Sequence, residues 1–302
     1  MKEPTVLFKK AVSINNKSDP ADLVNEDGVQ ELPVGVNIDI SDNGRVERRK
    51  GTVQTLAGDF HSLYPAHSEY LLCVSGTDLM VLESDLVTTT SIRTVTENAR
   101  LSCVRYGDKC YYANGYELGY VEDRVHVAWE AGTYVGPTTT KTFANPPLGS
   151  LLEVHGGRML IAQGNVVWYS QPFWFGGFNL AANYLLLHSN VTAMKSVTEG
   201  VFISDESTTY FFKGKDIKSA EMEVAYDDSI VQGSVCRDTI MASEALNLQT
   251  GTITYWATGK GFCLGTDSGK VINLTQARIK LPSVLRGCIL ARDKHILLLL
   301  EP

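Results

Sequence analysis

The chain has 302 residues, of which 44% are hydrophobic and 20% are charged, and its formal net charge at pH 7 is −7. This length and apolar fraction suit one large domain, or two smaller ones, with a substantial core. The acidic balance argues against general nucleic-acid affinity, which needs a basic surface, although it allows a local basic patch. No apolar run approaches a membrane span, and the first residues do not resemble a signal peptide.

Residues 1–33 differ from the rest of the chain. Turn signals occur at Asp19-Pro20 and at Gly28, and the segment is polar and short. Because such a segment cannot bury a core of its own, we expect an irregular N-terminal arm that reaches a neighbouring subunit. A single domain is then expected over residues 34–302.

The next element is a hairpin over residues 36–56. Residues 36–40 alternate apolar and polar side chains, and Asn43-Gly44 is a strong turn signal. The returning strand carries the densest basic cluster of the chain, which consists of Arg45, Arg48, Arg49 and Lys50. This cluster is a candidate contact with an acidic partner surface or with DNA phosphates. The alternative is a charged edge strand that discourages wrong pairing.

From residue 70 onward one pattern recurs: an apolar run, a turn and a second apolar run. Its copies occupy residues 70–82, 101–112, 151–169, 192–212 and 253–272, and a partial copy occupies 287–300. A period of this length with several short strands per unit predicts an all-β propeller of about six blades. We expect residues 36–56 to pair with 287–301 and close the ring, because closure hides strand edges. The alternative is two packed sandwich domains divided near Pro146-Pro147.

The segment 171–179 is unusually rich in aromatic residues, interrupted by Pro172 and two glycines. We expect an ordered loop and no regular strand here. Its rings either cover a propeller blade or form a subunit interface, since interface cores favour Trp and Phe. The interface candidates are Phe173, Trp174, Phe175 and Phe178.

No catalytic, cofactor or metal motif stands out. The six histidines are scattered, and there is no Cys-x-x-Cys, no Gly-x-Ser-x-Gly and no phosphate-binding loop. The acid pairs are expected in solvated turns; they are Glu122-Asp123, Asp205-Glu206 and Asp227-Asp228. The six cysteines are expected to be buried thiols, with a disulfide between Cys103 and Cys110 as the alternative. We therefore expect no enzyme, no cofactor and no metal.

In residues 34–51 an asparagine-bearing strand leads through a turn to an Arg-Arg-Lys-Gly ending. This segment and several other short ones resemble bacteriophage virion proteins. The resemblance as a whole covers roughly residues 34–290. Its further segments lie in the middle and at the end of the chain and are 167–172, 178–179, 189–194, 199–203, 209–214, 259–265 and 273–275.

The resemblance implies a propeller-type tail protein, either the nozzle or a ring that seals packaged DNA below the portal. It further implies a ring of identical copies, expected to be hexameric, with other tail or portal-adaptor proteins as neighbours and transient contact with genomic DNA. Such a protein would assemble in the host cytoplasm and reside in the virion. The alternative function is a carbohydrate-binding or carbohydrate-active propeller that recognises a host receptor.

Overall fold

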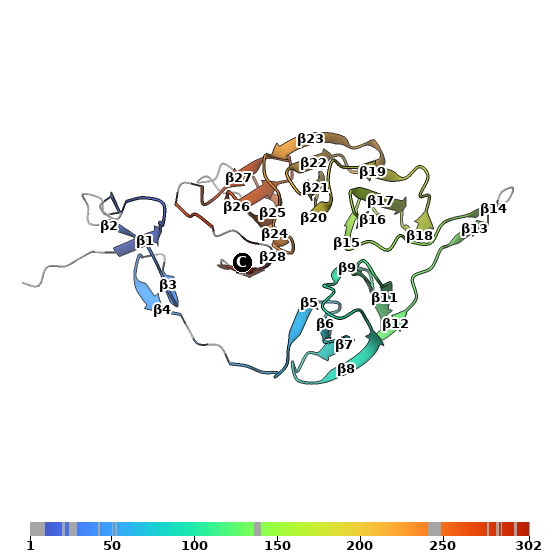
Figure 1. Ribbon diagram of the computed structural model, residues 1–302, viewed down its shortest axis with the longest axis horizontal. Helices are drawn as coiled ribbons and strands as arrows, with labels where there is room; N and C mark the ends of the chain where they lie inside the picture. Colours follow the sequence, from blue (N-terminus) through green and yellow to red (C-terminus); the bar gives the residue numbers. More distant parts are fainter. Residues whose placement is uncertain are drawn as a thin grey trace, which may run out of the picture.

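The computed structural model describes residues 10–19, 22–23, 29–41, 43–49, 51, 53–135, 140–240, 249–276, 278–281, 284, 286–292 and 295–301. Within these residues regular structure is almost entirely β, apart from short 3-10 turns. The expected all-β, propeller-like fold is confirmed by five consecutive antiparallel blades arranged along an arc (Figure 1).

Each blade is a meander in which the strands pair in chain order. Blade 1 is β5 (Phe60–Tyr64), β6 (Tyr70–Ser75), β7 (Asp78–Glu83) and β8 (Thr89–Thr94). Blade 2 is β9 (Ser102–Tyr106), β10 (Lys109–Ala113), β11 (Leu118–Glu122) and β12 (Val125–Val127). Blade 3 is β15 (Leu151–His155), β16 (Arg158–Gln163), β17 (Val166–Gln171), β18 (Trp174–Phe178) and β19 (Tyr184–Leu186), where β18 and β19 both pair with β17.

Blades 4 and 5 follow the same plan. Blade 4 is β20 (Val191–Val197), β21 (Gly200–Asp205), β22 (Thr209–Lys213) and β23 (Glu221–Tyr226), with the 3-10 helix η2 (Ile217–Ser219) between its last two strands. Blade 5 is β24 (Val235–Ile240), β25 (Gly251–Thr258), β26 (Gly261–Thr266) and β27 (Val271–Asn273). The first strands of successive blades contact one another, from β9 through β15 and β20 to β24.

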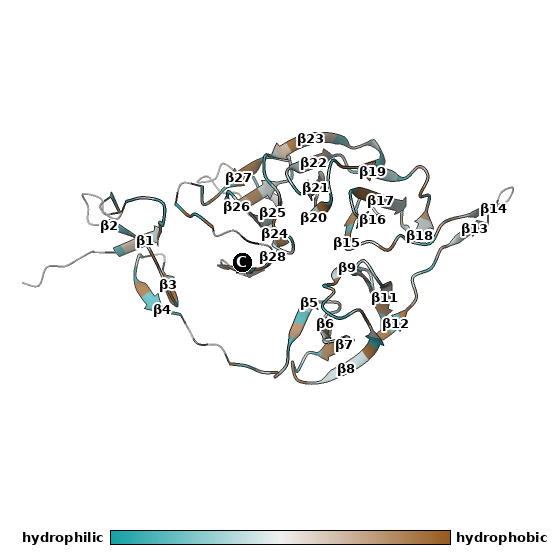
Figure 2. Ribbon diagram, in the orientation of Figure 1, coloured by the Kyte–Doolittle hydropathy of each residue, from teal (hydrophilic) through white to brown (hydrophobic). Residues whose placement is uncertain are grey.

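The core lies between the blades. Every residue of β21 and of β26 is buried, because a middle strand is covered on both faces by neighbouring blades and therefore reads as a continuous apolar run. Four apolar clusters join blades 1 and 2, 2 and 3, 3 and 4, and 4 and 5. Figure 2 shows apolar colour on many blade strands and hydrophilic colour at many turns.

The cluster between blades 2 and 3 excludes the two-sandwich alternative. Trp129 packs in it against Phe175 and Phe178, on the other side of the proposed boundary near Pro146-Pro147. One continuous succession of blades therefore crosses this point. A separate hairpin of β13 (Thr133–Val135) and β14 (Thr140–Thr142) projects from the connection between the two blades (Figure 1).

The expected closure of the ring is wrong in its details. The last two strands, β28 (Arg286–Arg292) and β29 (His295–Glu301), form a two-stranded sheet, and so do β3 (Ile38–Ile40) and β4 (Val46–Arg48). Within the described residues no strand pairing joins the two sheets. In the part of the chain that the structure describes, the sixth blade has two strands, and the hairpin that was expected to complete it lies elsewhere.

The N-terminal segment is more ordered than expected. Its described part contains β1 (Lys10–Ile14) and β2 (Val29–Leu32), which pair in parallel outside the blades. The Asn16 amide N–H donates to the Arg278 carbonyl at 2.9 Å, and Glu31 forms an ion pair with Arg278 at 2.9 Å. These contacts fasten the segment to the same chain after β27, while its predicted reach to a neighbour stays a prediction.

Candidate interaction surfaces

The two-stranded sixth blade exposes apolar side chains. Leu290 lies opposite Leu297, and Cys288 lies opposite Leu299, on one face of the sheet. The three leucines are 58%, 43% and 60% exposed in chain order. Of the described side chains of β28 and β29, none belongs to a buried apolar cluster, in contrast to every complete blade. Among the described residues this sheet is two strands short of a complete blade, and its leucine face is uncovered.

The inner side of the sixth blade is nevertheless fixed to its neighbours. The Gly287 amide N–H donates to the Gln232 carbonyl at 2.8 Å, and β28 contacts β24 of blade 5. On the other side, Arg100 before blade 2 forms an ion pair with Glu301 at 3.3 Å. The incomplete blade is thus anchored in its expected position, with β29 as its free outer edge.

The predicted basic cluster lies on the β3–β4 hairpin and is exposed where it is described. Arg45 pairs with Glu47 and Arg49 pairs with Asp39, both at 3.4 Å. Arg48 lies on the opposite face of β4, paired in register with Ile38. Lys50 lies outside the described residues. Local carboxylates therefore offset part of the positive charge that the sequence displays.

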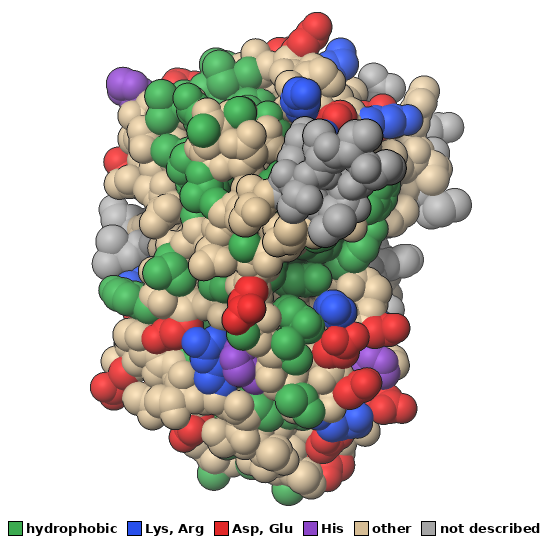
Figure 3. Space-filling view, turned by 90° about the vertical axis from the view of Figure 1, so that its right-hand side faces the viewer, with side chains coloured by type: hydrophobic (Ala, Val, Ile, Leu, Met, Phe, Trp, Pro, Cys, Tyr) green, Lys and Arg blue, Asp and Glu red, His purple; other side chains and the backbone are tan. Residues whose placement is uncertain are grey.

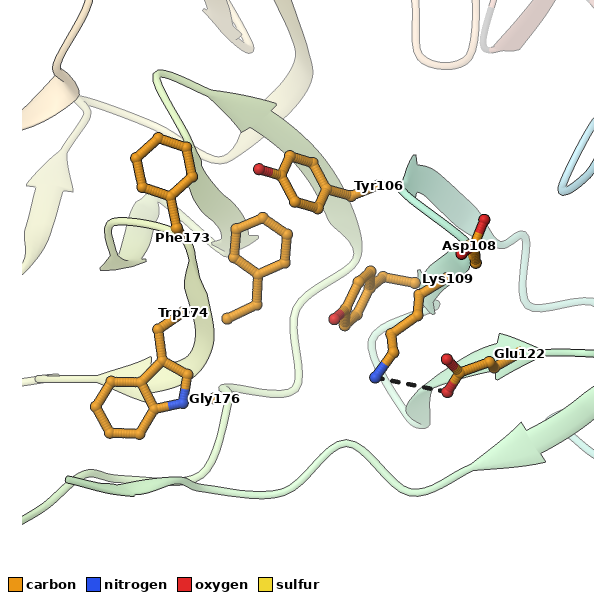
Figure 4. A pocket seen from close by; sticks show the side chains of 9 residues that line it. Tyr106, Asp108, Lys109, Glu122, Phe173, Trp174 and Gly176 are labelled. Carbon is orange, nitrogen blue, oxygen red and sulfur yellow. Dashed lines mark ion pairs between the residues drawn. The ribbon is translucent and has the colours of Figure 1, made fainter. Parts of the chain in front are cut away.

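A hollow of about 360 Å³ lies between blades 2 and 3 (Figure 4). Blade 2 contributes the turn from β9 to β10 and the end of β11, and blade 3 contributes the turn from β17 to β18. Tyr106 packs edge-on against Phe175 at 4.8 Å, and Lys109 pairs with Glu122 at 3.5 Å. Burial raises the pKa of Tyr111, in the wall of the hollow, to about 12, so this phenol stays neutral.

Phe173 is the most exposed ring of the aromatic segment. It is 75% exposed and adopts a φ of +56°, a left-handed conformation that is costly for an aromatic residue. Its amide N–H donates to the Gly157 carbonyl at 2.6 Å, and its ring lies so close to Gly157 that a Cβ there would be 2.5 Å away. This strain at an exposed aromatic residue makes Phe173 a candidate functional position.

The expectation of a loop at 171–179 is wrong, since Trp174–Phe178 forms β18. Phe175 and Phe178 are buried in the cluster between blades 2 and 3, so they are unavailable to a partner. Trp174 is half-buried and packs edge-on against Phe143 at 4.8 Å. Gly176 permits this arrangement, because a Cβ there would lie 3.0 Å from the Glu130 carbonyl oxygen.

The acidic residues are engaged in turns and ion pairs. Asp205 is fully buried, contrary to the expected solvated position, because it accepts hydrogen bonds from the amide N–H groups of Ser207 and Thr208. Backbone donors of this kind lower its pKa against the opposing effect of burial. Asp227 is exposed and pairs with Lys260 at 3.2 Å. Among the described residues no group of His, Cys, Asp and Glu is suited to hold a metal ion.

All six cysteines are free thiols. Cys103 and Cys110 lie on adjacent strands of blade 2, and the neighbouring Cys110 thiol together with burial raises the pKa of Cys103 well above its ordinary value. Cys288 is exposed, unlike the predicted buried thiols. Within the part of the chain that the structure describes, no helix has the length and apolarity to cross a membrane.

The face seen in Figure 3 mixes its charges. Apolar side chains gather in its upper half, and acidic and basic side chains alternate in its lower half. A face with both signs interspersed has no extended positive field of the kind that attracts nucleic acid.

Comparison with known proteins returns fold similarity only. No family model matches the chain, and no curated protein matches it either. Among solved structures, the WD40 β-propeller domain of Doa1 matches 71% of this chain and 68% of its own length at 10% identity and a TM-score of 0.45. BBS1N in complex with ARL6DN matches 87% of this chain and 83% of its own length, at 10% identity and a TM-score of 0.46.

The extracellular domain of BT4673 from B. thetaiotaomicron gives a TM-score of 0.48 at 14% identity, over 77% of this chain and 30% of that one. These similarities accord with the propeller fold, which the sheets of this chain display by themselves. None of these similarities shows what this chain does.

Proposed function

We propose that this chain is a non-enzymatic structural subunit of a bacteriophage tail that assembles with identical copies into a ring around the DNA-ejection channel. One observation carries the assembly part of the proposal: the sixth blade has an unpaired outer strand and an exposed face of leucines. Monomeric proteins rarely leave a long apolar edge strand free, because it invites pairing with another chain. The phage assignment rests on the sequence resemblance.

The exposed arginines of the β3–β4 hairpin support a position of this hairpin beside the channel or against an acidic neighbour. Its exposed ion pairs are weak, since Arg49 and Asp39 are each about half exposed. A phosphate or a partner's carboxylate can therefore readily replace the carboxylates that pair with these arginines. In this proposal Arg48 is the most available contact, because its side chain lies on the face opposite the paired Arg45 and Arg49.

The test combines a mass measurement with imaging of particles. The purified chain is examined by light scattering and mass photometry, and tailed particles from its source culture are examined by mass spectrometry and three-dimensional reconstruction. We expect an oligomer of uniform size and density for this propeller in an axial ring. A chain that stays monomeric at all concentrations and is absent from purified particles contradicts the proposal.

A second candidate is carbohydrate binding, favoured by the hollow between blades 2 and 3. Exposed Phe173 and Tyr106 offer rings on which a sugar could stack, beside the polar groups of Asp108 and Lys109. Titration with neutral oligosaccharides, followed by saturation-transfer NMR, tests this function. Binding that Phe173→Ala abolishes supports it, whereas equal signals for the two proteins contradict it.

A further inference from the structure

Among the described residues one blade is two strands short, and three two-stranded sheets lie outside the blades: β1-β2, β3-β4 and β13-β14. The sixth blade has β28 and β29 where every other blade has at least four strands. The β3–β4 hairpin is a two-stranded sheet of its own, outside any blade. Adding the hairpin to the free edge of β29 gives a four-stranded sheet in the order β28-β29-β4-β3, which is the size of a complete blade.

The free edges fit this order. The hairpin is held on its β3 side, where β3 contacts β1. Among the described residues β4 has no strand partner other than β3, so its outer edge is open. On the sixth blade the inner strand β28 contacts blade 5, which leaves β29 as the open edge. The open edges of β4 and β29 are a liability that pairing between them removes.

The faces fit as well. Register pairs Ile40 with Val46 and Ile38 with Arg48, so one face of the hairpin carries three apolar side chains and, at the end away from the turn, the exposed Arg48. The three apolar side chains are only partly covered in the single chain. Joining the sheets extends this face along the exposed leucines at positions 290, 297 and 299. The opposite face of the hairpin, with Asp39 and Glu47, is polar and suits a surface that stays in water.

Contacts within the chain hold the hairpin away from its own β29. The Ala11 amide N–H donates to the Gly44 carbonyl at 2.9 Å in the hairpin turn. Gly44 has a φ of +80°, and a Cβ there would lie only 2.6 Å from the Lys10 Cβ, so this close approach requires glycine. The segment carrying β1 is fastened in turn to residues 278–280, where the Lys280 amide N–H donates to Asn16 Oδ1 at 2.7 Å.

We propose that the β3–β4 hairpin of one copy completes the sixth blade of a second copy by pairing β4 with β29. Such an exchange leaves the contacts of the N-terminal segment intact in both copies. Each copy gives one hairpin and receives one, which is a head-to-tail contact that generates a closed ring when the rotation between copies permits it. The exchange deepens the ring assembly proposed above and rests on it for its biological setting.

The decisive experiment is cross-linking between marked copies. One variant carries Val46→Cys in the hairpin and the other carries Leu299→Cys in β29, both in a Cys288→Ser background because Cys288 is exposed. The two proteins are mixed over a range of concentrations and treated with a short bis-maleimide. The background protein and each variant alone serve as controls for reaction of the native thiols.

We expect a product of twice the 33.1 kDa chain mass in the mixture and none in the controls. A chain that carries both substitutions tests whether the hairpin pairs with β29 of its own copy instead of β29 of another copy. If it gives only a cross-linked product of monomer mass, or if no product forms in any sample, the exchange between copies is overturned. If the chain fails this test and still forms a ring in particles, the hairpin exchange is contradicted, but the proposed structural function is not.

A charge at the same edge gives an independent readout. Leu299→Glu should raise the dissociation constant for self-association at least about tenfold, since a carboxylate would be buried among leucines. The matched control is Val125→Glu, which places the same charge on the edge strand β12 at a residue that is 60% exposed. Equal self-association of the two variants, with unchanged melting temperatures, contradicts the proposal.

Discussion

The buried ion pair between blades 3 and 4 should be a major contribution to stability. Arg158 is 7% exposed and binds Asp216 with two hydrogen bonds, Nε to Oδ1 at 2.8 Å and Nη2 to Oδ2 at 3.2 Å. Its Nη1 donates to the Ser170 carbonyl at 2.8 Å. Replacing Asp216 by Ala leaves the guanidinium buried without its anionic partner.

The magnitude follows from the burial of the two partners. Breaking a fully buried pair costs about 3–5 kcal/mol, whereas exposed pairs contribute about 0–1 kcal/mol. Asp216 is 48% exposed, so water partly replaces it. We therefore expect Asp216→Ala to lower the free energy of unfolding by about 2–3 kcal/mol. The matched control is Asp227→Ala, whose carboxylate is 95% exposed and should change stability by less than about 0.5 kcal/mol.

Urea unfolding followed by tryptophan fluorescence measures the free energy of unfolding of both variants, and its pH dependence provides a second test. The hydrogen bonds from Arg158 hold the pKa of Asp216 below its ordinary 3.8. The stabilisation is thus fully present above that value and is lost as pH falls through the lower pKa of the folded state. The difference between wild type and Asp216→Ala should shrink in this acidic range. Equal stability of the two proteins at pH 7 would refute the reasoning.

Three further outcomes are expected. Trp256→Ala should cost about 3–5 kcal/mol in urea unfolding, because this fully buried ring packs against Phe202 between blades 4 and 5. Phe173→Gly should change stability by less than about 1 kcal/mol, because glycine removes the strain of the left-handed backbone and this gain offsets the lost ring contacts. Calorimetry measures this change. Iodoacetamide should label Cys288 first in the monomer, as mass spectrometry will show, and an assembled ring should protect it; equal labelling of buried Cys263 would contradict this.

The repeated apolar runs were enough to predict the blades, because a middle strand covered on both faces has to be apolar at every position. The closure was predicted wrongly for a physical reason. The hairpin at 36–56 and the strands at 287–301 both carry the pattern of half a blade, and the pattern contains no information on which edges meet. That choice depends on distant contacts, such as those of Ala11 with Gly44 and of Asn16 with Arg278.

The aromatic segment shows a second limit of sequence reasoning. Its glycines suggested a loop, yet Gly176 allows β18 to approach Glu130 closely, and Phe175 on the same strand lies in the core. Asp205 was expected in water for a similar reason, since turn acids are usually exposed. Here neighbouring amide groups replace the water. Both errors arise because burial is decided by the packing of blades and not by the local composition.

The two candidate surfaces lie on different parts of the arc, and this separation bears on how the molecule works. The sixth blade lies at one end of the succession of blades, whereas the hollow with Phe173 lies between blades 2 and 3 (Figure 1). The first has unsatisfied strand edges, which favour another β-sheet as partner. The second has fully paired strands and exposed rings, which favour a ligand that stacks. In the proposed ring, the subunit would engage its own copies through the sixth blade and leave the hollow open to a different partner.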